Sequence, residues 1–397
     1  MKLNSFFLAV CLLFVSNLTI AQTQLNVKKE IAYAAKQYKG MLATHPDIKK
    51  FPQSIKPDGS LNDRTSDWWC SGFFGGSLWY LFEATKDTAW KNAAYKWTMA
   101  VEKEQYNKGT HDLGFMLYCP FGNGYRLTKD ERYKQIMLTG AASLATRFNP
   151  TYGVIKSWDG WKGYDYPVII DNMMNLEFLF WAAKTSGDKN FYNICISHAD
   201  STLKNHFRQD YSSYHVVCYG EGGKVLAQKT HQGAADSSAW ARGQGWAMYG
   251  YTTMYRETKD PKYLAQAEHV AQFILNHPNL PKDKIPYWDF NAPNIPNEER
   301  DASAGALIAS GLLELSQYSK THNKQYISAA KAMLVSLASP AYKAQIDSNH
   351  NFILMHSVGS KPHNSEVNTP LVYADYYYLE ALLRYDKLIN KKQKLKF

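Results

Sequence analysis

The sequence predicts an all-α protein, an (α/α)6 toroid with small β additions in its loops. Three observations lead to this prediction: an apolar-aromatic helix followed by a polar turn recurs along the 397 residues, the second helix of each pair begins Asp-x-x-aromatic, and the helical stretches number about twelve. A repeated helix pair that cannot bury its faces alone must stack on its neighbours, and six such pairs can close into a ring. An open solenoid of the same pairs is the competing arrangement.

The aspartate of each repeat marks where the second helix begins. Its side chain can accept hydrogen bonds from the free backbone N–H groups of the first turn, so it is a natural N-cap. Pro261 fits the first-turn position that follows. The repeats place Asp87 before Trp90, Asp130 before Tyr133, Asp188 before Phe191 and Asp260 before Tyr263, with Asn323 in the aspartate position before Tyr326.

The remaining elements complete the ring. A first helix is expected near Val27–Leu42 and a last one over YADYYYLEALLRY, while YHVVCYG and NFILMHS are strand-like. No Pro/Ser-rich linker interrupts the chain, so residues 22–397 are expected to form one domain. In this arrangement the helices that precede the Asp-x-x-aromatic helices are inner ones. Their starts face a common mouth, where chemical side chains should gather.

Residues 1–21 are expected to be a signal peptide. Lys2 precedes a short apolar run, and the small residues Thr19 and Ala21 suit cleavage before Gln22. The run is too short for a convincing membrane span, and no later segment is apolar enough to be one. We therefore expect an exported protein, located in the periplasm.

Composition narrows the class of partner. The net charge of +10 comes from scattered lysines rather than from a basic helix with interleaved aromatics, which argues against nucleic acid. Such a charge could instead favour acidic polysaccharide fragments. The 28 Tyr and 11 Trp suit carbohydrate binding, although helix packing accounts for many of them. Cys70, Cys119, Cys195 and Cys218 form no CxxC pair, so buried free thiols are favoured over disulfides.

The segment Thr230 to Trp246, THQGAADSSAWARGQGW, is the strongest candidate for a ligand-binding loop. Small residues let the backbone approach a ligand, and larger side chains supply contacts. If the segment is helical from Ser238, Arg242 and Trp246 project from one face. A guanidinium beside an indole suits a flat anionic ligand such as an acidic sugar. A core helix with a capping loop is the alternative.

Two acids are the candidates for proton chemistry. Asp112 in HDLGFM and Asp171 in YPVIIDNMMNLE each lie among apolar neighbours at an inner-helix start. Burial and a second nearby carboxylate raise the pKa of a carboxyl group, which can then act as a proton donor near neutral pH. Either residue could be an N-cap instead. The adjacent His111 and Asn172 are polar groups that a cap does not require, and we count them as candidate substrate contacts.

The other polar residues are weaker candidates. Asp289 follows Trp288, whose ring could stack on a sugar, while Glu221 and Asp301 suit a solvated turn and a cap. No HxxxH or HExxH spacing is present, so no metal or other cofactor is expected. No GxSxG elbow or phosphate-binding loop occurs either.

Eight segments in order resemble the unsaturated glucuronyl hydrolases, glycoside hydrolase family 88: WWCSGFFGG, HDLGF, IIDNMMNLE, SSYHVV, THQGAADSSAWARGQGW, PYWDF, RDASAGAL and YADYYYLEALLR. The resemblance implies an (α/α)6 barrel, with Asp171 as general acid/base and Asp112 as its essential partner. It also implies sugar contacts from Trp69, His111, His215, Gln232, Arg242, Trp246 and Trp288. The segment HSVGSKPHNSEV departs from several members, so Ser357, Ser360, Lys361 and Ser365 are candidates only.

The resemblance also implies a reaction. Asp171 would protonate C4 of a 4,5-unsaturated uronic acid at the non-reducing end of a lyase-generated, glycosaminoglycan-type oligosaccharide, and water would add at C5. A rhamnogalacturonyl or ulvan-type uronyl hydrolase of the same fold is the nearest alternative. A sugar epimerase on the same toroid would use paired histidines and would normally lack an export signal. A non-catalytic glycan-binding protein would need the aromatics but not two sunken aspartates.

Overall fold

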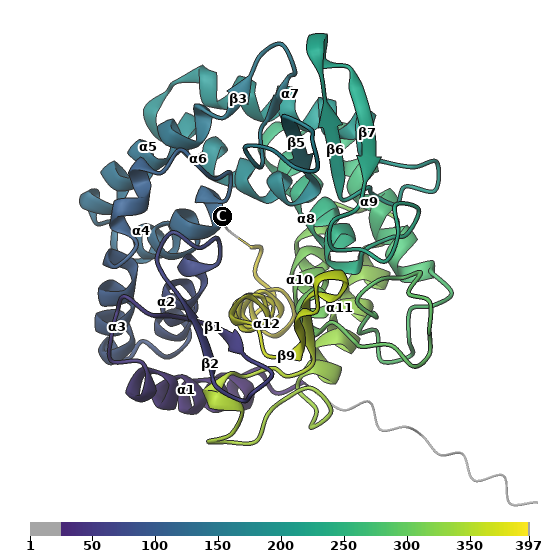
Figure 1. The fold of residues 1–397 in the computed structure, drawn as a ribbon. Helices are drawn as coiled ribbons and strands as arrows, with labels where there is room; N and C mark the ends of the chain where they lie inside the picture. Colours follow the sequence, from purple (N-terminus) through teal and green to yellow (C-terminus); the bar gives the residue numbers. More distant parts are fainter. Residues whose placement is uncertain (1–24, 396–397) are drawn as a thin grey trace, which may run out of the picture.

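The protein forms a closed ring of helices in two layers (Figure 1). The structure is a computed structural model that describes residues 25–395, so the expected signal peptide lies outside the described residues. Within that range twelve α-helices alternate along the chain between the outer and the inner layer. The outer helices are α1 (Val27–Thr44), α3 (Thr88–Met99), α5 (Glu131–Ala145), α7 (Lys189–Asn205), α9 (Pro261–Asn276) and α11 (Asn323–Leu337).

The inner layer is less regular than the outer one. Two of its helices are preceded by irregular turns, the π-helical η2 (Gly114–Gly122) and the 3-10 helix η3 (Ile170–Asn175). The inner helices are α2 (Ser71–Thr85), α4 (Asn123–Thr128), α6 (Leu176–Ser186), α8 (Ala241–Thr258), α10 (Ala302–Leu315) and α12 (Val372–Tyr385).

The last inner helix closes the ring. Helix α12 packs against α10 on one side and against α2 on the other, so the final repeat meets the first. Each inner helix also pairs with an outer neighbour, as α8 does with α9 and α10 with α11. The predicted toroid is therefore confirmed, and the open solenoid is wrong.

The two layers differ in burial because they differ in sequence. Every residue of α10 and of α12 is buried, as expected for helices that are enclosed on all sides. The outer helices bury one face only. Glycines let inner elements approach closely: a Cβ at Gly72 would lie 2.2 Å from the carbonyl oxygen of Phe115.

Four of the five predicted caps are confirmed, and the fifth is wrong. The side chains of Asp87, Asp130, Asp188 and Asp260 each accept a backbone N–H in the first turn of α3, α5, α7 and α9. Helix α11 begins at Asn323 itself, with His322 before it and no side-chain cap. The Asn323 side-chain amide instead donates to the carbonyl of Ser316 at 2.5 Å, a contact that spacing alone does not reveal.

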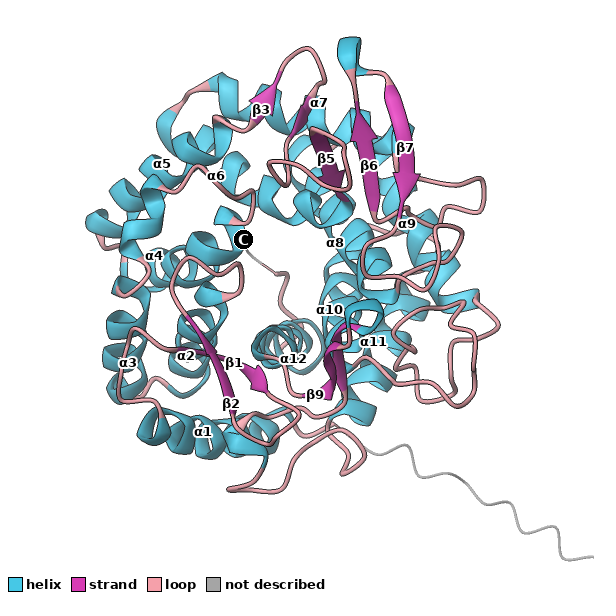
Figure 2. Cartoon of the chain, in the orientation of Figure 1, coloured by secondary structure: helices cyan, strands magenta, loops and turns pink. Residues whose placement is uncertain are grey.

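The strands form small separate sheets over the helical ring (Figure 2). The prediction of a strand in YHVVCYG is confirmed by β6. NFILMHS is not a strand as a whole: it forms one isolated bridge, from Leu354 to Lys343, and only its last residue, Ser357, belongs to β8. The strands are β1 (Phe51–Ile55), β2 (Leu61–Arg64), β3 (Phe148–Asn149), β4 (Val154–Ile155), β5 (Tyr166–Ile169), β6 (Val216–Tyr219), β7 (Val225–Lys229), β8 (Ser357–Ser360) and β9 (Ser365–Thr369).

Two further expectations concern solvent and membrane exposure. Cys70, Cys119, Cys195 and Cys218 are buried free thiols, as the sequence favoured. Across residues 25–395, no helix combines the length and apolar character needed to cross a bilayer.

Candidate active site

The starts of the inner helices meet at one mouth of the ring, and the predicted site residues lie there. Trp69 precedes α2, Asp112 precedes η2, Asp171 lies in η3 and Arg242 lies in the first turn of α8. Inner helices that all run from the mouth inward bring together residues that are far apart in the sequence. The three-stranded sheet β5–β6–β7 and the β8–β9 hairpin add walls around this mouth.

Asp112 is a carboxyl group sunk into the apolar wall of the mouth. Its side chain is 15% exposed, and Oδ2 accepts a hydrogen bond from the hydroxyl of Thr110 at 3.1 Å. Nε2 of His111 lies 3.4 Å from Oδ1. Burial raises the pKa of Asp112 to about 7, against the lowering effects of the Thr110 hydrogen bond and of Arg147. The group can therefore hold a proton near neutrality.

Asp171 is a second acid of the same kind. Burial raises its pKa to about 7; the charge of Arg242 opposes this shift, and the carboxyl group of Asp112 adds to it. The indole N–H of Trp246 faces Asp171 and has no other partner, and Nε2 of His215 lies 3.5 Å from Oδ2. Two neighbouring carboxyl groups that both resist ionisation can exchange protons with a bound substrate.

Close packing of η2 on η3 brings the two acids together. A Cβ at Gly114 would lie 2.5 Å from Oδ1 of Asn175, so only glycine allows this approach. The side chains of His111 and Asn172 also interact across the contact, while Nδ2 of Asn172 donates to the carbonyl of Ile155 at 2.8 Å. Burial, reinforced by the charge of Arg147, lowers the pKa of His111 to about 3. The ring is neutral and can donate or accept a hydrogen bond at the site.

Two predicted sugar contacts, Gln232 and Arg242, hold the β8–β9 hairpin at the mouth. Nε2 of Gln232 donates to the carbonyl of Gly359 at 2.8 Å, and Nη2 of Arg242 donates to the same oxygen at 2.7 Å. Nη1 of Arg242 donates to Oδ2 of Asp301 and to the carbonyl of Val358. Arg242 and Trp246 lie on one helix, as predicted, although α8 begins at Ala241 rather than Ser238.

The other predicted aromatic contacts occupy different depths. Trp69 is half-buried and packs on Phe115 and Tyr373 at the wall of the mouth. Trp288 is only 4% exposed, and its indole N–H donates to Glu298 at 2.8 Å. Ser365 is exposed at the start of β9, where it pairs with Ser360. Trp288 thus has protein partners on most sides, while Ser365 faces solvent; their substrate contacts stay predictions.

Sequence reasoning overlooked two tryptophans that line the mouth. Trp158 and Trp161, in the loop between β4 and β5, pack on the ring of His231 at centroid distances of 5.1 and 5.9 Å. Trp158 also lies 6.4 Å from the ring of His215, beside Asp171. The signal is present in SWDGW, where two indoles flank a turn, while the acid between them, Asp159, is exposed and pairs with Arg147.

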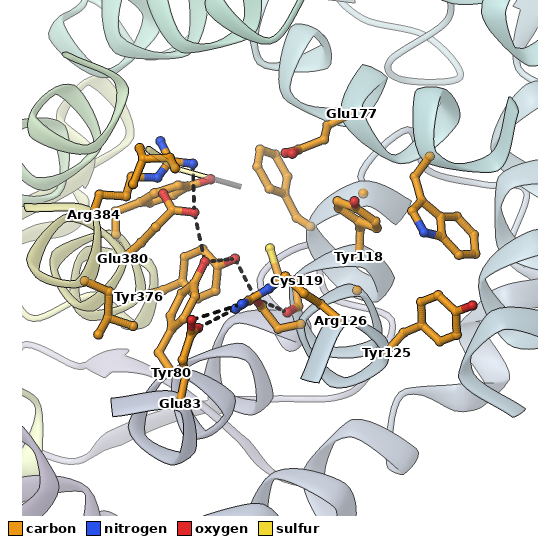
Figure 3. Close-up of a pocket in the computed structure, with 18 of the residues that line it drawn as sticks. Tyr80, Glu83, Tyr118, Cys119, Tyr125, Arg126, Glu177, Tyr376, Glu380 and Arg384 are labelled. Carbon is orange, nitrogen blue, oxygen red and sulfur yellow. Dashed lines mark hydrogen bonds and ion pairs between the residues drawn. The ribbon is translucent and has the colours of Figure 1, made fainter. Parts of the chain in front are cut away.

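A cavity of about 240 Å³ lies at the opposite end of the inner helices (Figure 3). Its carboxylates are held by cations: Arg126 pairs with Glu83 at 2.5 Å, and Arg384 lies 3.5 Å from Glu380. Although burial raises the pKa of Glu83, the bond to Arg126 and the charge of Lys387 bring it to about 2. Glu83 is therefore ionised at neutral pH and cannot serve as a proton donor there, whereas burial raises the pKa of both acids at the mouth.

The comparison with known families agrees with this geometry. The sequence profile of Glycosyl Hydrolase Family 88 matches residues 44–388, which is most of the chain. The chain belongs to glycosyl hydrolase family 88. As a member of this family it is a glycoside hydrolase, and its resemblance to the unsaturated glucuronyl hydrolases is confirmed.

Relatives within family 88 cover nearly all of the chain. An unsaturated glucuronyl hydrolase of Formosa agariphila is 46% identical over 98% of this chain and 100% of its own length. An unsaturated chondroitin disaccharide hydrolase of Streptococcus pneumoniae is 32% identical over 92% of this chain and 94% of its own. The crystal structure of an unsaturated glucuronyl hydrolase specific for heparin superposes with a TM-score of 0.89 at 48% identity, over 94% of this chain and 99% of that one.

Proposed function

We propose that this protein removes the 4,5-unsaturated uronic acid from the non-reducing end of glycosaminoglycan-type oligosaccharides by hydrating the C4=C5 bond. The observation that carries the proposal is the buried pair Asp112 and Asp171, each with its pKa raised to about 7 at the mouth of the ring. An uncharged carboxyl group at neutral pH is what protonation of a carbon atom requires.

The chemistry follows from the electronic structure of the substrate. C5 carries the ring oxygen, so the C4=C5 bond is a vinyl ether and its C4 accepts a proton. Asp171 protonates C4, which leaves an oxocarbenium-like centre at C5, and the resulting carboxylate then takes a proton from the water that attacks C5. The hemiketal opens and releases the rest of the oligosaccharide. Asp171 returns to its protonated form, so atoms and charge balance over one cycle.

Asp112 supports this cycle through its position beside Asp171. The carboxyl group of Asp112 raises the pKa of Asp171, which keeps the donor protonated in the resting enzyme. No nucleophile attacks C1, so the carboxylate separation that distinguishes retaining from inverting glycosidases has no bearing on this reaction.

The substrate is held mainly by flat aromatic side chains at the mouth. Trp69, Trp158 and Trp161 are half-buried at the mouth and offer apolar faces to a planar unsaturated sugar. Arg242 contributes mainly by holding the β8–β9 hairpin, because its N–H groups donate to Asp301 and to two backbone carbonyls. Its direct contact with the sugar carboxylate is part of the proposal.

Among glycosaminoglycans, we expect heparin-type disaccharides to be turned over well. The supporting observation is the relative specific for heparin, which shares 48% of its residues and nearly its full length with this chain. Chondroitin-type disaccharides are the second group to examine, since a relative at 32% identity bears that name. The net charge of +10 would aid capture of either anionic fragment.

We also propose export to the periplasm, on the strength of residues 1–21. The measurement is the N-terminal sequence of the mature protein recovered from cell fractions. A mature chain that begins at Gln22 in the periplasmic fraction is expected, whereas an intact Met1 in the cytoplasm would contradict export.

Loss of near-ultraviolet absorbance tests the activity, because hydration destroys the conjugated double bond. Unsaturated disaccharides prepared by lyases from heparin, chondroitin, hyaluronan and ulvan are compared at equal concentration. We expect the fastest loss with a glycosaminoglycan disaccharide. Unchanged absorbance across the whole panel would refute the proposal. Turnover of the ulvan fragment alone would show that the substrate is an ulvan-type oligosaccharide and not a glycosaminoglycan.

A further inference from the structure

The ring of His215 has an unusual set of neighbours. Its Nδ1 faces two successive backbone amides, accepting from the N–H of His231 at 3.2 Å and from the N–H of Gln232 at 3.1 Å. Its side chain is fully buried, with the indole of Trp240 against one face at a centroid distance of 4.4 Å. The imidazole therefore cannot rotate without losing both hydrogen bonds and its packing.

These two bonds decide where the imidazole proton lies. A nitrogen that accepts from two backbone N–H groups cannot carry hydrogen, so the neutral ring has its proton on Nε2. Protonation of Nδ1 would place three N–H groups against one another in a buried site. The His231–Gln232 turn thus excludes the imidazolium form as well as the other tautomer.

The protonated nitrogen faces Asp171. Nε2 lies 3.5 Å from Oδ2, and each of these atoms is buried with no hydrogen-bond partner elsewhere. The separation is longer than that of a normal hydrogen bond, as catalytic hydrogen bonds often are before substrate binds. The side chain of Asp171 is 14% exposed although Oδ2 is buried, so its exposed surface belongs to its other atoms.

We propose that His215 is a positioning residue whose neutral Nε2–H, set by the backbone amides of His231 and Gln232, holds Oδ2 of Asp171 and leaves Oδ1 to exchange the proton with the substrate. The inference rests on the proposed hydration and deepens it by assigning separate tasks to the two oxygens of one carboxyl group. It also assigns a task to the THQG turn that is independent of any contact with the sugar.

The charges around the pair explain why neutrality of His215 matters. Asp171 faces Arg242 from α8, which stabilises its carboxylate, and Asp112 from the start of η2, which opposes it. His215 faces His231, Arg242, His206 and His111, all of which disfavour a second cation, and burial disfavours it more strongly. An imidazolium beside Arg242 would hold Asp171 ionised, and the carboxyl group could not donate a proton near pH 7.

Ring nitrogen NMR on histidine-labelled protein tests the tautomer directly. We expect one buried histidine, assigned by its loss in His215→Gln, to carry hydrogen on Nε2 only and to remain uncharged throughout the active pH range. A proton on Nδ1, or an imidazolium within that range, would overturn the inference. This readout needs no substrate, so it stands apart from the activity itself.

Paired substitutions test the effect on Asp171. The side-chain amide of His215→Gln reaches the position of Nε2, whereas that of His215→Asn reaches only the position of Nδ1. We expect the basic limb of the kcat profile to stay in place in His215→Gln and to move up by about one pH unit in His215→Asn, since losing a donor to the carboxylate raises its pKa. The wild-type enzyme must first be shown to turn over a disaccharide. If the basic limb of the kcat profile then lies at the same pH in both variants, the role of the Nε2–H donor is refuted.

The turn itself is tested by Gln232→Pro against Gln232→Ala. Both variants lose the side chain, but only proline removes the backbone N–H that Nδ1 accepts. We expect a second tautomer or a titrating imidazolium in the proline variant and the wild-type tautomer in the alanine variant. An identical His215 spectrum in two folded variants would show that the Gln232 amide does not set the tautomer. If no disaccharide is hydrolysed, the proposed function fails while the tautomer assignment is still decided by NMR.

Discussion

Nη1 of Arg242 donates to Oδ2 of Asp301 across 3.0 Å, and both side chains are buried. Asp301 is also the N-cap of α10, where its Oδ1 accepts from the N–H of Ser303. Because the same guanidinium donates to the carbonyls of Val358 and Gly359, this ion pair joins α8, α10 and β8 at one point beside the mouth. The charge of Arg242 reaches Asp171 as well, where it opposes the effect of burial.

Arg242→Lys and Arg242→Met should separate the structural and electrostatic roles of this residue. Lysine keeps the charge but cannot hold two carbonyls and a carboxylate as the forked guanidinium does, so we expect kcat/KM to fall by about tenfold or more. The basic limb of the pH profile should stay at its wild-type position. Methionine also removes the charge that lowers the pKa of Asp171, so the basic limb of the pH profile should move to higher pH. The measurement is the pH profile of absorbance loss.

A control for Arg242→Met is needed because it leaves Asp301 buried without its cation. Breaking such a pair costs about 3–5 kcal/mol of stability. Adding Asp301→Asn to Arg242→Met should restore part of the thermal stability, while the basic limb of the pH profile should stay at its higher pH. Equal pH profiles for the lysine and methionine variants would contradict an electrostatic effect on Asp171.

Asp171→Asn should lower kcat by about 100- to 10,000-fold, the usual contribution of a positioned proton donor. The amide has nearly the size of the carboxyl group, so the fold should persist, which circular dichroism would verify. Asp188→Asn, at the cap of α7 far from the mouth, is the matched control and should retain activity. Wild-type rates in Asp171→Asn would show that Asp171 is not the proton donor.

The pH profile of the native enzyme should show a basic limb near pH 7. Asp171 must be protonated to act, and burial raises its pKa to about 7, so kcat/KM should decline as pH rises through that value. In Asp112→Asn the residual activity should decline at lower pH, because the neighbouring carboxyl group that raises the pKa of Asp171 is gone. A basic limb at the same pH in Asp112→Asn and in the wild type would show that Asp112 does not raise the pKa of Asp171.

Asp112→Asn should also alter stability in a pH-dependent way. A carboxyl group with a folded pKa of about 7, above its unfolded value of 3.8, contributes stability below pH 4 that is lost as pH rises toward 7. The variant should therefore gain on the wild type between pH 4 and pH 7 by up to about 4 kcal/mol. Urea unfolding at several pH values measures the difference, and a constant difference would contradict the raised pKa.

The aspartate caps of the outer helices should each contribute about 1 kcal/mol to the free energy of unfolding. Asp87→Ala removes the acceptor for the N–H of Ala89, which lies 2.9 Å away, and Asp260→Ala removes that for Lys262. Replacement by asparagine preserves the acceptor and should cost little. Alanine and asparagine variants of equal stability in urea unfolding would show that these caps carry no weight.

Most of the architecture was predictable from local patterns. The caps Asp87, Asp130, Asp188 and Asp260 are set by interactions within three residues, and such short-range chemistry is readable in a sequence. The failure at Asn323 has the opposite origin: its amide is used by Ser316, seven residues back, so the residue stands inside the helix rather than at its cap.

The candidate site was predictable in its location but not in its detailed contacts. Asp112 and Asp171 could be found because acids among apolar residues at inner-helix starts are unusual. Trp158 and Trp161 could not be placed, since only the folding of the β4–β5 loop brings them to His231. Their contribution depends on an irregular segment that has no period to recognise.

The sequence by itself determined the alternating helices, the family and the two acids, because each depends on periodicity or on contiguous motifs, whereas closure of the ring is shown by the packing of α12 on α2. Only the tertiary structure decided that Arg242 is held by Asp301 and that His215 presents Nε2 to Asp171. These partners are 59 and 44 residues apart. Folding of the inner helices and of the segments around the mouth brings these groups together, and the resulting contacts determine which atoms remain free for chemistry.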